Sequence, residues 1–491
     1  MILDWRSEVN IILLSGGSGK RLWPLSNDIR SKQFIKIFKK DDGTYESMVQ
    51  RMYRMIRTVD PDATVTIATS KTQVSAINNQ LGEGVGISIE PCRRDTFPAI
   101  ALATAYLADV MHVPSDETVV VCPVDPYVEE DYFVALKTLC DRAASGSANL
   151  VLMGMEPTYP SEKYGYIMTE GPAGRQGDDL TSSQKLWKAS LPDEVFYESG
   201  NVTLGNERER LLGGCLNQPQ NVLFAPVSEF KEKPDLETAK SYLAQGALWN
   251  GGVFAYKLSY VLDKAHELID FTDYNDLFSK YETLTKISFD YAVVEKEKNI
   301  EVMRFSGQWK DLGTWNTLTE AMEEPVIGEA ILNDKCEDVH VINELNGPVL
   351  AMGIKNAVIC ASAQGILVSD KNQSSFIKPF VDKIDDRIMF SEKSWGSYRV
   401  IAVEEGSMTV MVTLNPGHGM HYHSHKLRDE VWTVISGSGT AVIDEVVYPV
   451  KPGDVLRMRA GQKHKVSADT ELKIVEVQIG SEISVQDKEK W

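Results

Sequence analysis

Short apolar runs alternate with longer helical patterns from about residue 10 to residue 325, and this alternation limits the fold more than any other feature. The runs are β-branched or leucine-rich and about as long as a buried strand: Ile11–Leu14, Val65–Ala68, Val85–Ile89, Thr118–Cys122 and Leu150–Met155. Ser47–Ile56 and Pro98–Met111 have helical spacing. Buried strands separated by helices are typical of a mostly parallel sheet with helices on both faces. The sequence therefore predicts an α/β domain over residues 1–325.

The helical pattern weakens after residue 325. Residues 326–388 read as short strands and turns, a β-rich connecting segment for which a β-helix-like form is one option, ending in a helical or extended stretch over 375–384. From 389 to 491, glycine and proline interrupt apolar runs at regular intervals. This spacing predicts a β-barrel or sandwich as a separate domain.

Charge and cysteine content narrow the function classes. The chain has 491 residues and a net charge of −19, and no basic face of the kind that binds nucleic acid is visible. The cysteines are scattered without a CxxC pair, which favours reduced thiols. No stretch approaches the roughly 18 apolar residues of a membrane span, and no signal peptide is evident. We expect a cytoplasmic protein with small-molecule partners and neither a nucleic-acid nor a membrane partner; a homo-oligomer stays open.

A glycine-rich loop follows the first expected strand. Gly16, Gly17 and Gly19 allow a ligand to approach the backbone closely, and Lys20 and Arg21 add cationic donors. The pattern is neither the Walker GxxxxGK[ST] nor the Rossmann GxGxxG. On its own it fits an anion-binding loop or a plain structural turn.

Motifs along the whole chain then give the loop a context. In order they read GGSGKRLWPLS, KQF, EPCRRDTFPAIALA, PVDPYV, KYGYI, FKEKPD, WNGGVF, SFDYAVVEK and WKDLGTW. This ordered set resembles the sugar-nucleotide pyrophosphorylases, and within them the long bacterial mannose-1-phosphate guanylyltransferases. The resemblance implies a Rossmann-like (GT-A-like) mixed sheet for the first domain and a cupin β-barrel for the last.

The resemblance also implies a reaction. GTP and mannose 1-phosphate would give GDP-mannose and pyrophosphate by in-line attack on the α-phosphate, with Mg²⁺ held by Asp125 and Asp311. The catalytic residues implied are Arg21, Lys32, Asp125, Lys233 and Asp311. The nucleotide would contact Gly16, Gly17, Gly19, Lys20, Glu90, Arg94 and Asp95. The sugar would contact Gly165, Glu232, Asn250 and Gly251.

Several positions depart from the family pattern. Asparagine replaces arginine at 27, serine replaces proline at 31, aspartate replaces asparagine at 95, phenylalanine replaces a small residue at 97, and proline replaces histidine at 126. Two of these, Asp95 and Phe97, would lie near the nucleotide. A different base or hexose phosphate therefore stays open.

A histidine-rich stretch near the end predicts a metal site. Residues two apart face the same side of a strand, so His421, His423 and His425 are expected to point together. With Glu430 and His464, the spacing resembles the cupin metal motif, which implies His423, His425, Glu430 and His464 as ligands. Three imidazoles and a carboxylate suit Zn²⁺, Fe²⁺, Mn²⁺ or Ni²⁺. A metal-free cupin with solvated histidines is the alternative.

The last domain resembles a type II phosphomannose isomerase from Ser394–Val400 to Val475–Gly480. Arg428 and Glu430 match that family, whereas Leu427 and Val431 do not. Conversion of mannose 6-phosphate to fructose 6-phosphate is thus an open second activity. Two further alternatives are a non-catalytic sugar-nucleotide or metal-binding regulatory protein, and an isomerase with a spent transferase domain.

Overall fold

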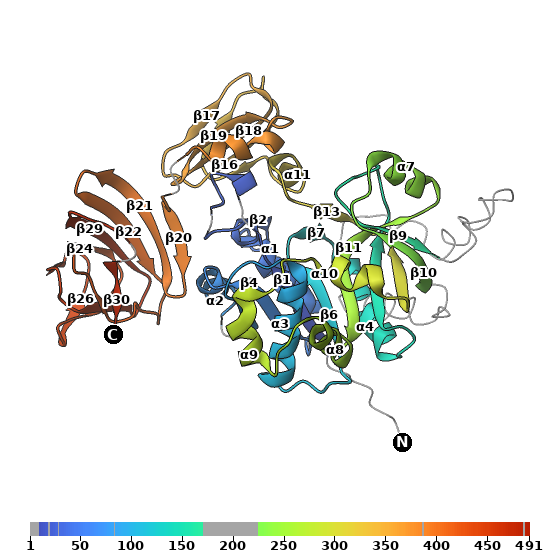
Figure 1. Cartoon of the computed structure of the whole chain (residues 1–491). Coiled ribbons are helices and arrows are strands. Elements are labelled where there is room, and N and C mark those ends of the chain that lie inside the picture. Colours follow the sequence, from blue (N-terminus) through green and yellow to red (C-terminus); the bar gives the residue numbers. More distant parts are fainter. Residues whose placement is uncertain are drawn as a thin grey trace, which may run out of the picture.

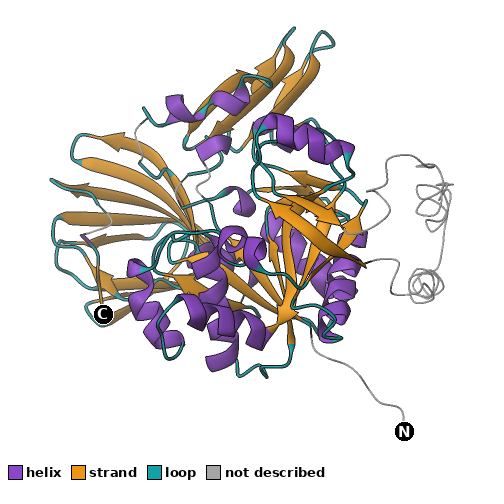
Figure 2. Cartoon of the chain, turned by 45° about the vertical axis from the view of Figure 1, so that its right-hand side comes forward, coloured by secondary structure: helices purple, strands orange, loops and turns teal. Residues whose placement is uncertain are grey.

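A computed structural model of the chain describes residues 9–17, 20–27, 29–82, 84–169, 224–384, 387–484 and 487–491. A large sheet with helices on both faces, a small stack of short strands and a two-sheet β-structure follow one another along the chain (Figures 1 and 2). Among the described helices, none has the length and apolar character needed to cross a membrane.

The large sheet has nine strands. Their spatial order is β5 (Gly86–Glu90), β4 (Thr64–Ser70), β1 (Asn10–Ser15), β6 (Thr118–Pro123), β11 (Leu248–Lys257), β8 (Leu150–Met155), β12 (Ile300–Phe305), β10 (Phe224–Lys231) and β9 (Tyr166–Thr169). Strands β5, β4, β1 and β6 are mutually parallel, as are β8 and β12. Strand β11 lies antiparallel between β6 and β8, so the sheet is mixed rather than mostly parallel. The five apolar runs are strands as predicted, but their periodicity carried no information about the direction of β11.

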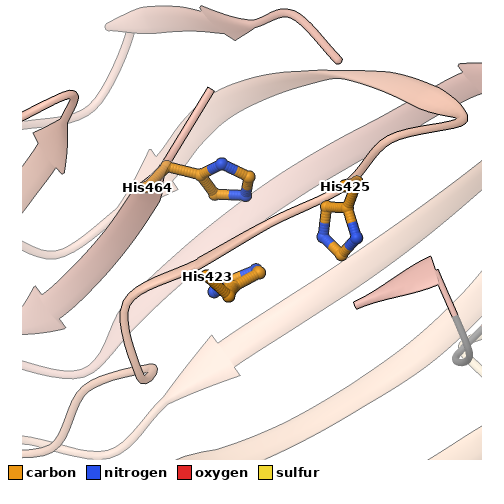
Figure 3. Close-up of side chains that lie close together, drawn as sticks. All are labelled: His423, His425 and His464. Carbon is orange, nitrogen blue, oxygen red and sulfur yellow. The ribbon is translucent and has the colours of Figure 1, made fainter. Parts of the chain in front are cut away.

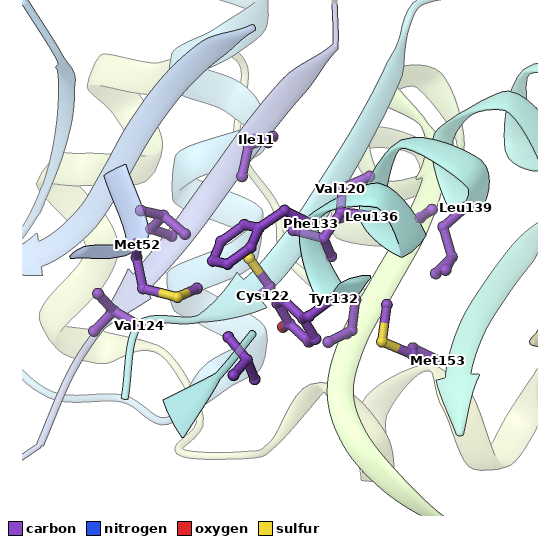
Figure 4. Close-up of a cluster of buried hydrophobic side chains, with 14 of the residues drawn as sticks. Ile11, Met52, Val120, Cys122, Val124, Tyr132, Phe133, Leu136, Leu139 and Met153 are labelled. Carbon is purple, nitrogen blue, oxygen red and sulfur yellow. The ribbon is translucent and has the colours of Figure 1, made fainter. Parts of the chain in front are cut away.

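Alternation along β1 explains how two layers of helices cover the sheet. Ile11 and Leu13 pack into a core with helices α1 (Met48–Val59) and α4 (Glu130–Ala144), whereas Ile12 packs on the opposite face with α3 (Thr96–Asp109) and α8 (Leu258–Leu268). Figure 4 shows part of the first core, where Met52, Tyr132 and Phe133 surround the sheet residues Ile11 and Cys122. Because both faces are buried, each strand reads as a continuous apolar run.

The middle of the chain forms short, largely parallel strands. One sheet has the order β14 (Val326–Ile327), β16 (Glu337–Asn343), β18 (Lys355–Ser362) and β19 (Gly365–Asp370), and a second pairs β15 (Ala330–Leu332) with β17 (Val349–Ala351). All these pairs are parallel except β18 with β19. Residues 374–381 are helical, a 3₁₀ turn (Ser374–Phe376) followed by α12 (Lys378–Val381).

The last part consists of two facing sheets. Six strands form the first, in the order β20 (Phe390–Lys393), β21 (Gly396–Glu404), β22 (Ser407–Leu414), β29 (Leu472–Gly480), β24 (Arg428–Ser436) and β27 (Val455–Met458). Five form the second, in the order β26 (Val446–Val450), β25 (Gly439–Ile443), β28 (His464–Ala468), β23 (His423–Ser424) and β30 (Glu489–Lys490). Alternate residues of β24 and β29 are buried between the sheets, which is the barrel or sandwich pattern that the turn spacing predicts.

The segment after the glycine loop packs against the later parts of the chain. The indole nitrogen of Trp315, in α11 (Trp315–Thr319), donates to the Trp23 carbonyl at 3.2 Å, and Ser362 Oγ donates to the Pro24 carbonyl at 2.8 Å. Arg30 makes two hydrogen bonds to the Glu344 carboxylate, at 2.9 and 2.8 Å, and lies over the ring of Phe390. All three parts of the chain therefore meet at residues 23–30.

We expect Gly365→Ala to destabilise this junction. Gly365 has φ +149°, and a Cβ there would lie 2.5 Å from Cζ2 of Trp23. Strain and displacement of the indole should lower the free energy of unfolding by about 1–3 kcal/mol. Denaturant unfolding measures the effect. Gly347→Ala is the matched control because a Cβ there meets no atom within 4 Å; equal stability of the two variants would contradict the expectation.

Candidate functional site

The carboxyl ends of the parallel strands form the edge where the predicted residues gather. Gly16 and Gly17 follow β1, and Asp125 lies just beyond the end of β6. Gly17 has φ +124°, and a Cβ on Gly16 or Gly17 would meet no atom within 4 Å. The backbone here is thus exposed to a ligand, in a conformation that glycine adopts readily. Gly19 lies outside the described residues.

Lys32 joins two aspartates at this edge. Its Nζ is 2.8 Å from Asp125 Oδ2 and 3.1 Å from Asp311 Oδ1. Asp125 precedes β7 (Pro126–Val128) and Asp311 ends β13 (Trp309–Asp311); these strands pair with Pro126 opposite Asp311, which brings the two carboxylates together. Burial lowers the pKa of Lys32, but the two carboxylates outweigh burial and the net pKa is raised. Lys32 is therefore a fixed cation.

The two aspartates fit a magnesium site that a substrate completes. Their side chains are 35% and 46% exposed, and both direct a carboxylate oxygen at the same ammonium group. Mg²⁺ is typically held by one or two carboxylates together with substrate phosphates and water. Asp125 and Asp311 would hold the ion, with Lys32 beside it.

The other expected nucleotide residues lie around the same edge with partners of their own. Arg21 is exposed in a 3₁₀ turn (Lys20–Leu22), and Lys20 pairs with Asp382 at 3.4 Å. Glu90 ends β5 and accepts a hydrogen bond from Tyr281 Oη at 2.7 Å; burial raises the pKa of its carboxyl. These residues therefore lie near the carboxyl ends of β1 and β5.

Arg94 and Asp95 have local backbone roles. Arg94 donates to the carbonyl of Glu282. Asp95 has φ +70° and caps α3 by accepting from the Thr96 amide at 2.8 Å. With ψ −176° the residue lies in a backbone region that residues other than glycine rarely adopt, so this capping position carries backbone strain.

A second cluster unites the expected sugar residues. A Cβ at Gly165 would lie 2.6 Å from Glu232 Oε2 and 3.3 Å from the Cβ of Asn250. Asn250 donates its backbone amide to the Gly165 carbonyl at 2.8 Å. Lys233 forms an ion pair with Glu232. Burial lowers the pKa of Lys233, but the Glu232 carboxylate has the larger effect, so the pKa of Lys233 is raised overall. Glycine is thus required at 165, where polar groups of two strands converge.

Gly251 follows Asn250 in the irregular part of β11 and is held by packing. A Cβ there would lie 2.4 Å from Cε of Met155, on the neighbouring strand β8. The next residue, Gly252, donates its amide to Asn250 Oδ1 at 3.1 Å. This hydrogen bond therefore orients the Asn250 side chain.

Asp290 belongs to this cluster although the motif analysis gave it no role. It lies in α10 (Phe289–Ala292) and accepts a hydrogen bond from Asn250 Nδ2 at 2.6 Å. Burial, and then the nearby charge of Glu232, raise the pKa of Asp290 to about 6. The motif SFDYAVVEK contains this aspartate, so a search for acidic residues inside the matching motifs would have found it.

Aromatic side chains line the space between the two clusters. Tyr164 contacts Trp249 and Trp309, with ring centroids 4.8 and 5.7 Å apart. Trp249 and Trp315 are buried packing residues. Trp309 lies two residues before Asp311 on β13, so this group of rings runs from the expected sugar residues to the carboxylate pair.

Three histidines converge inside the last part of the chain. The ring nitrogens of His423, His425 and His464 that face one another lie within 4.8 Å, and the three residues are buried (Figure 3). Each Nδ1 contacts a backbone carbonyl: His421 O at 2.7 Å, Asp487 O at 2.7 Å and Gln462 O at 2.9 Å. A carbonyl only accepts, so each neutral ring carries its proton on Nδ1 and presents an Nε2 lone pair to the centre.

Glu430 completes the set with a carboxylate. Its oxygens lie 3.1 Å from His425 Nε2 and 3.2 Å from His464 Nε2, while Arg428 Nε donates to it at 3.0 Å. Arg428 Nη2 also contacts His425 Nε2 at 3.0 Å, so the guanidinium balances part of the charge of the carboxylate. Burial lowers the pKa of His423 to about 3, and the buried Nε2 of His464 has no hydrogen-bond partner among the described residues. The three imidazoles therefore fit a divalent transition metal, for which Glu430 would be a fourth ligand.

His421 does not share this face, contrary to the expectation. It is exposed, and only its carbonyl contributes, by fixing the His423 ring. Strand β23 begins at His423, so strand alternation does not extend back to His421.

Comparison with known proteins gives two family matches. Residues 10–180 and 214–325 match the nucleotidyl transferase model, and residues 410–478 match the cupin domain model. The chain is 27% identical to the mannose-1-phosphate guanylyltransferase of Escherichia coli (strain K12), over 98% of this chain and 97% of that protein. It is 26% identical to the alginate biosynthesis protein AlgA of Pseudomonas putida, over 98% and 95% of the two chains.

A solved structure shares the fold. The crystal structure of a mannose-1-phosphate geranyltransferase from Thermus thermophilus covers 77% of this chain and 99% of its own, with a TM-score of 0.56 and 24% identity.

We expect Asp290→Asn to increase the stability of the protein more at pH 7.5 than at pH 4. The folded-state pKa of about 6 lies above the ordinary value of an aspartate, so the carboxyl contributes stability at low pH that is lost as pH rises through 6. An asparagine escapes this loss and should gain about 1–2 kcal/mol at pH 7.5 relative to pH 4. Thermal unfolding at both pH values measures the gain. Asp263→Asn, on the exposed side of α8, is the control; the same pH dependence in both variants would refute the assignment.

Removing one imidazole should empty the metal centre. His464→Gln should lower metal affinity more than about 100-fold, because even changes in the groups that orient ligands cost 10–100-fold. Elemental analysis after equilibration with Zn²⁺ and dialysis measures bound metal. His421→Gln should keep the metal content of the unmodified protein. Equal metal in the two variants would rule out this donor set.

Proposed function

The chain belongs to the nucleotidyl transferase family, and on that basis we propose that it makes GDP-mannose and pyrophosphate from GTP and mannose 1-phosphate. Similarity to mannose-1-phosphate guanylyltransferases over nearly the full length supports the substrates. The observation that carries the proposal is the meeting of Lys32, Asp125 and Asp311 at the edge that bears the glycine loop.

The reaction needs positioning and charge stabilisation rather than a covalent enzyme intermediate. A phosphate oxygen of the sugar attacks the α-phosphorus, the bond from the α-phosphorus to the bridging oxygen breaks, and pyrophosphate leaves with that oxygen. Exposed amides at Gly16 and Gly17 would bind phosphate oxygens, and Lys32 and Arg21 would offset charge on the leaving group. Mg²⁺ between Asp125 and Asp311 would supply further positive charge next to the phosphates.

The second cluster would bind the hexose phosphate. Lys233 is 55% exposed and is the cation available for the sugar phosphate, while Glu232, Asn250 and Asp290 offer acceptors and a donor for hydroxyl groups. Gly165 leaves room for close approach. The contacting rings of Tyr164 and Trp309 would form a wall between this cluster and the aspartates, against which the sugar would lie.

A second candidate activity is isomerisation of mannose 6-phosphate to fructose 6-phosphate at the cupin centre. The buried metal-ligand set, with Arg428 beside Glu430, supports it. Formation of fructose 6-phosphate that chelation abolishes would support this activity, and its absence in the metal-loaded protein would exclude it.

We further propose that the chain consists of separate units divided near residues 325 and 388. We also propose the cytoplasm as the compartment, because the described cysteines are free.

A pyrophosphate-release assay tests the main proposal. We expect turnover with GTP, mannose 1-phosphate and Mg²⁺ together, and less with other nucleoside triphosphates or hexose 1-phosphates. Lys32→Met should lower kcat/KM about 10²–10³-fold, as the loss of a transition-state donor does. Lys40→Met removes an exposed lysine that pairs with Asp42 and should change activity less than about twofold. Absence of turnover with every substrate pair would favour a non-catalytic binding protein.

A further inference from the structure

A buried polar network lies directly behind the glycine loop. At its centre is Gln73, which is 1% exposed and precedes α2 (Val74–Leu81). Its Nε2 donates to Ser31 Oγ at 2.6 Å, and its Oε1 accepts from Thr69 Oγ1 at 2.9 Å and from Gln33 Nε2 at 3.3 Å. None of the described residues carrying these polar atoms is charged, so the network is held by hydrogen bonds alone.

The network ends on the loop itself. Ser31 Oγ accepts from Gln73 and donates to the carbonyl of Gly17 at 3.1 Å. Gln33 Nε2 also donates to Ser15 Oγ at 3.1 Å, at the end of β1. Gln73 is thereby connected to the residues on both sides of the glycine loop's start, Ser15 and Gly17.

The same network flanks Lys32. Ser31 and Gln33 precede and follow Lys32, and both are 1% exposed and bonded to the Gln73 amide. Their side chains point into the protein while the Lys32 ammonium reaches Asp125 and Asp311. The Gln73 carboxamide is therefore hydrogen-bonded to residues that hold both the glycine loop and Lys32 in place.

Stability alone does not account for this arrangement. Buried polar groups must be desolvated, and apolar side chains of the same shape are often as stable. A fully bonded network instead selects one conformation, because any shift leaves a donor or acceptor unpaired. Such selection matters most where a displacement of about 1 Å costs activity.

We propose that Gln73 is a positioning residue for nucleotidyl transfer, setting the glycine loop and Lys32 in register through Ser31 and Gln33. This inference rests on the proposed function. It also explains how serine serves at position 31, where the family pattern has proline: the hydroxyl fixes by hydrogen bonds a segment that a proline ring would restrain covalently. Ser31 has φ −71° and ψ 165°, which proline also adopts.

A double-mutant cycle tests the proposal. Gln73→Met removes the amide at similar volume and should raise the KM for GTP about 10–100-fold, with a smaller fall in kcat. Ser31→Pro should lower stability, because Gln73 Nε2 loses its acceptor, but should keep the KM for GTP, since the Ser31 amide donates no hydrogen bond within the described chain and Arg93 Nη2 still donates to the Gly17 carbonyl at 2.9 Å. In the Ser31→Pro background, Gln73→Met should change KM less than about threefold, because its main partner is already gone.

A structural role predicts a different result. Thr104→Val is the matched control: Thr104 is buried in α3 and its hydroxyl contacts Tyr256 Oη at 3.2 Å, away from the loop. We expect it to lower the melting temperature and leave KM unchanged. The proposal is overturned if Gln73→Met behaves like this control, or if it raises KM equally in both backgrounds.

Failure of the proposed function is distinguishable. If the unmodified protein releases no pyrophosphate with any substrate pair, the proposed reaction is wrong, and the cycle is then measured by calorimetric GTP binding. A weaker Kd for Gln73→Met, relieved in the Ser31→Pro background, supports positioning of the loop; equal Kd values, or no GTP binding by any variant, overturn it.

Discussion

One ammonium group pairs with two carboxylates that would otherwise repel each other, and these ion pairs organise the site at the edge of the large sheet. Asp125 and Asp311 are far apart in the sequence and approach each other only because β7 pairs with β13. Lys32, from a third segment, lies between them. Because the largely buried Lys32 ammonium lies between these carboxylates, the strand pairing, the loop after β1 and the charge balance depend on one another.

Contacts with distant segments of the chain keep these three side chains in place. Residues 23–30 are held by Trp315, Ser362 and Glu344. The Gln73 network holds the adjoining segment from the opposite side, through Ser31. The chain after the glycine loop is thus restrained by segments that are distant in the sequence, which suits a site whose function is to hold anions in a fixed geometry.

The histidine site of the cupin domain is likewise held in place by contacts with other segments of the chain. Backbone carbonyls fix the tautomers of three imidazoles, and the Glu430 carboxylate lies beside two of them, His425 and His464. One of these carbonyls belongs to Asp487, next to the strand β30 that pairs with β23. The last strand of the chain is therefore part of what orients the ligands.

The sequence by itself indicated five of the buried strands, two of the helices and the residue types expected at both sites. Apolar runs such as Thr118–Cys122 became buried strands because burial on both faces requires continuous apolar side chains, and this requirement is local. The spacing of His423 and His425, with the more distant Glu430 and His464, indicated the ligand set, and the ordered motifs indicated Lys32, Asp125 and Asp311. Only the tertiary structure decided that β11 runs antiparallel between β6 and β8, that His421 faces away from the centre, and that Asp290 and Gln73 belong beside the predicted residues. Those outcomes depend on strand pairing and on contacts between distant segments, which the periodicity of a single stretch does not encode.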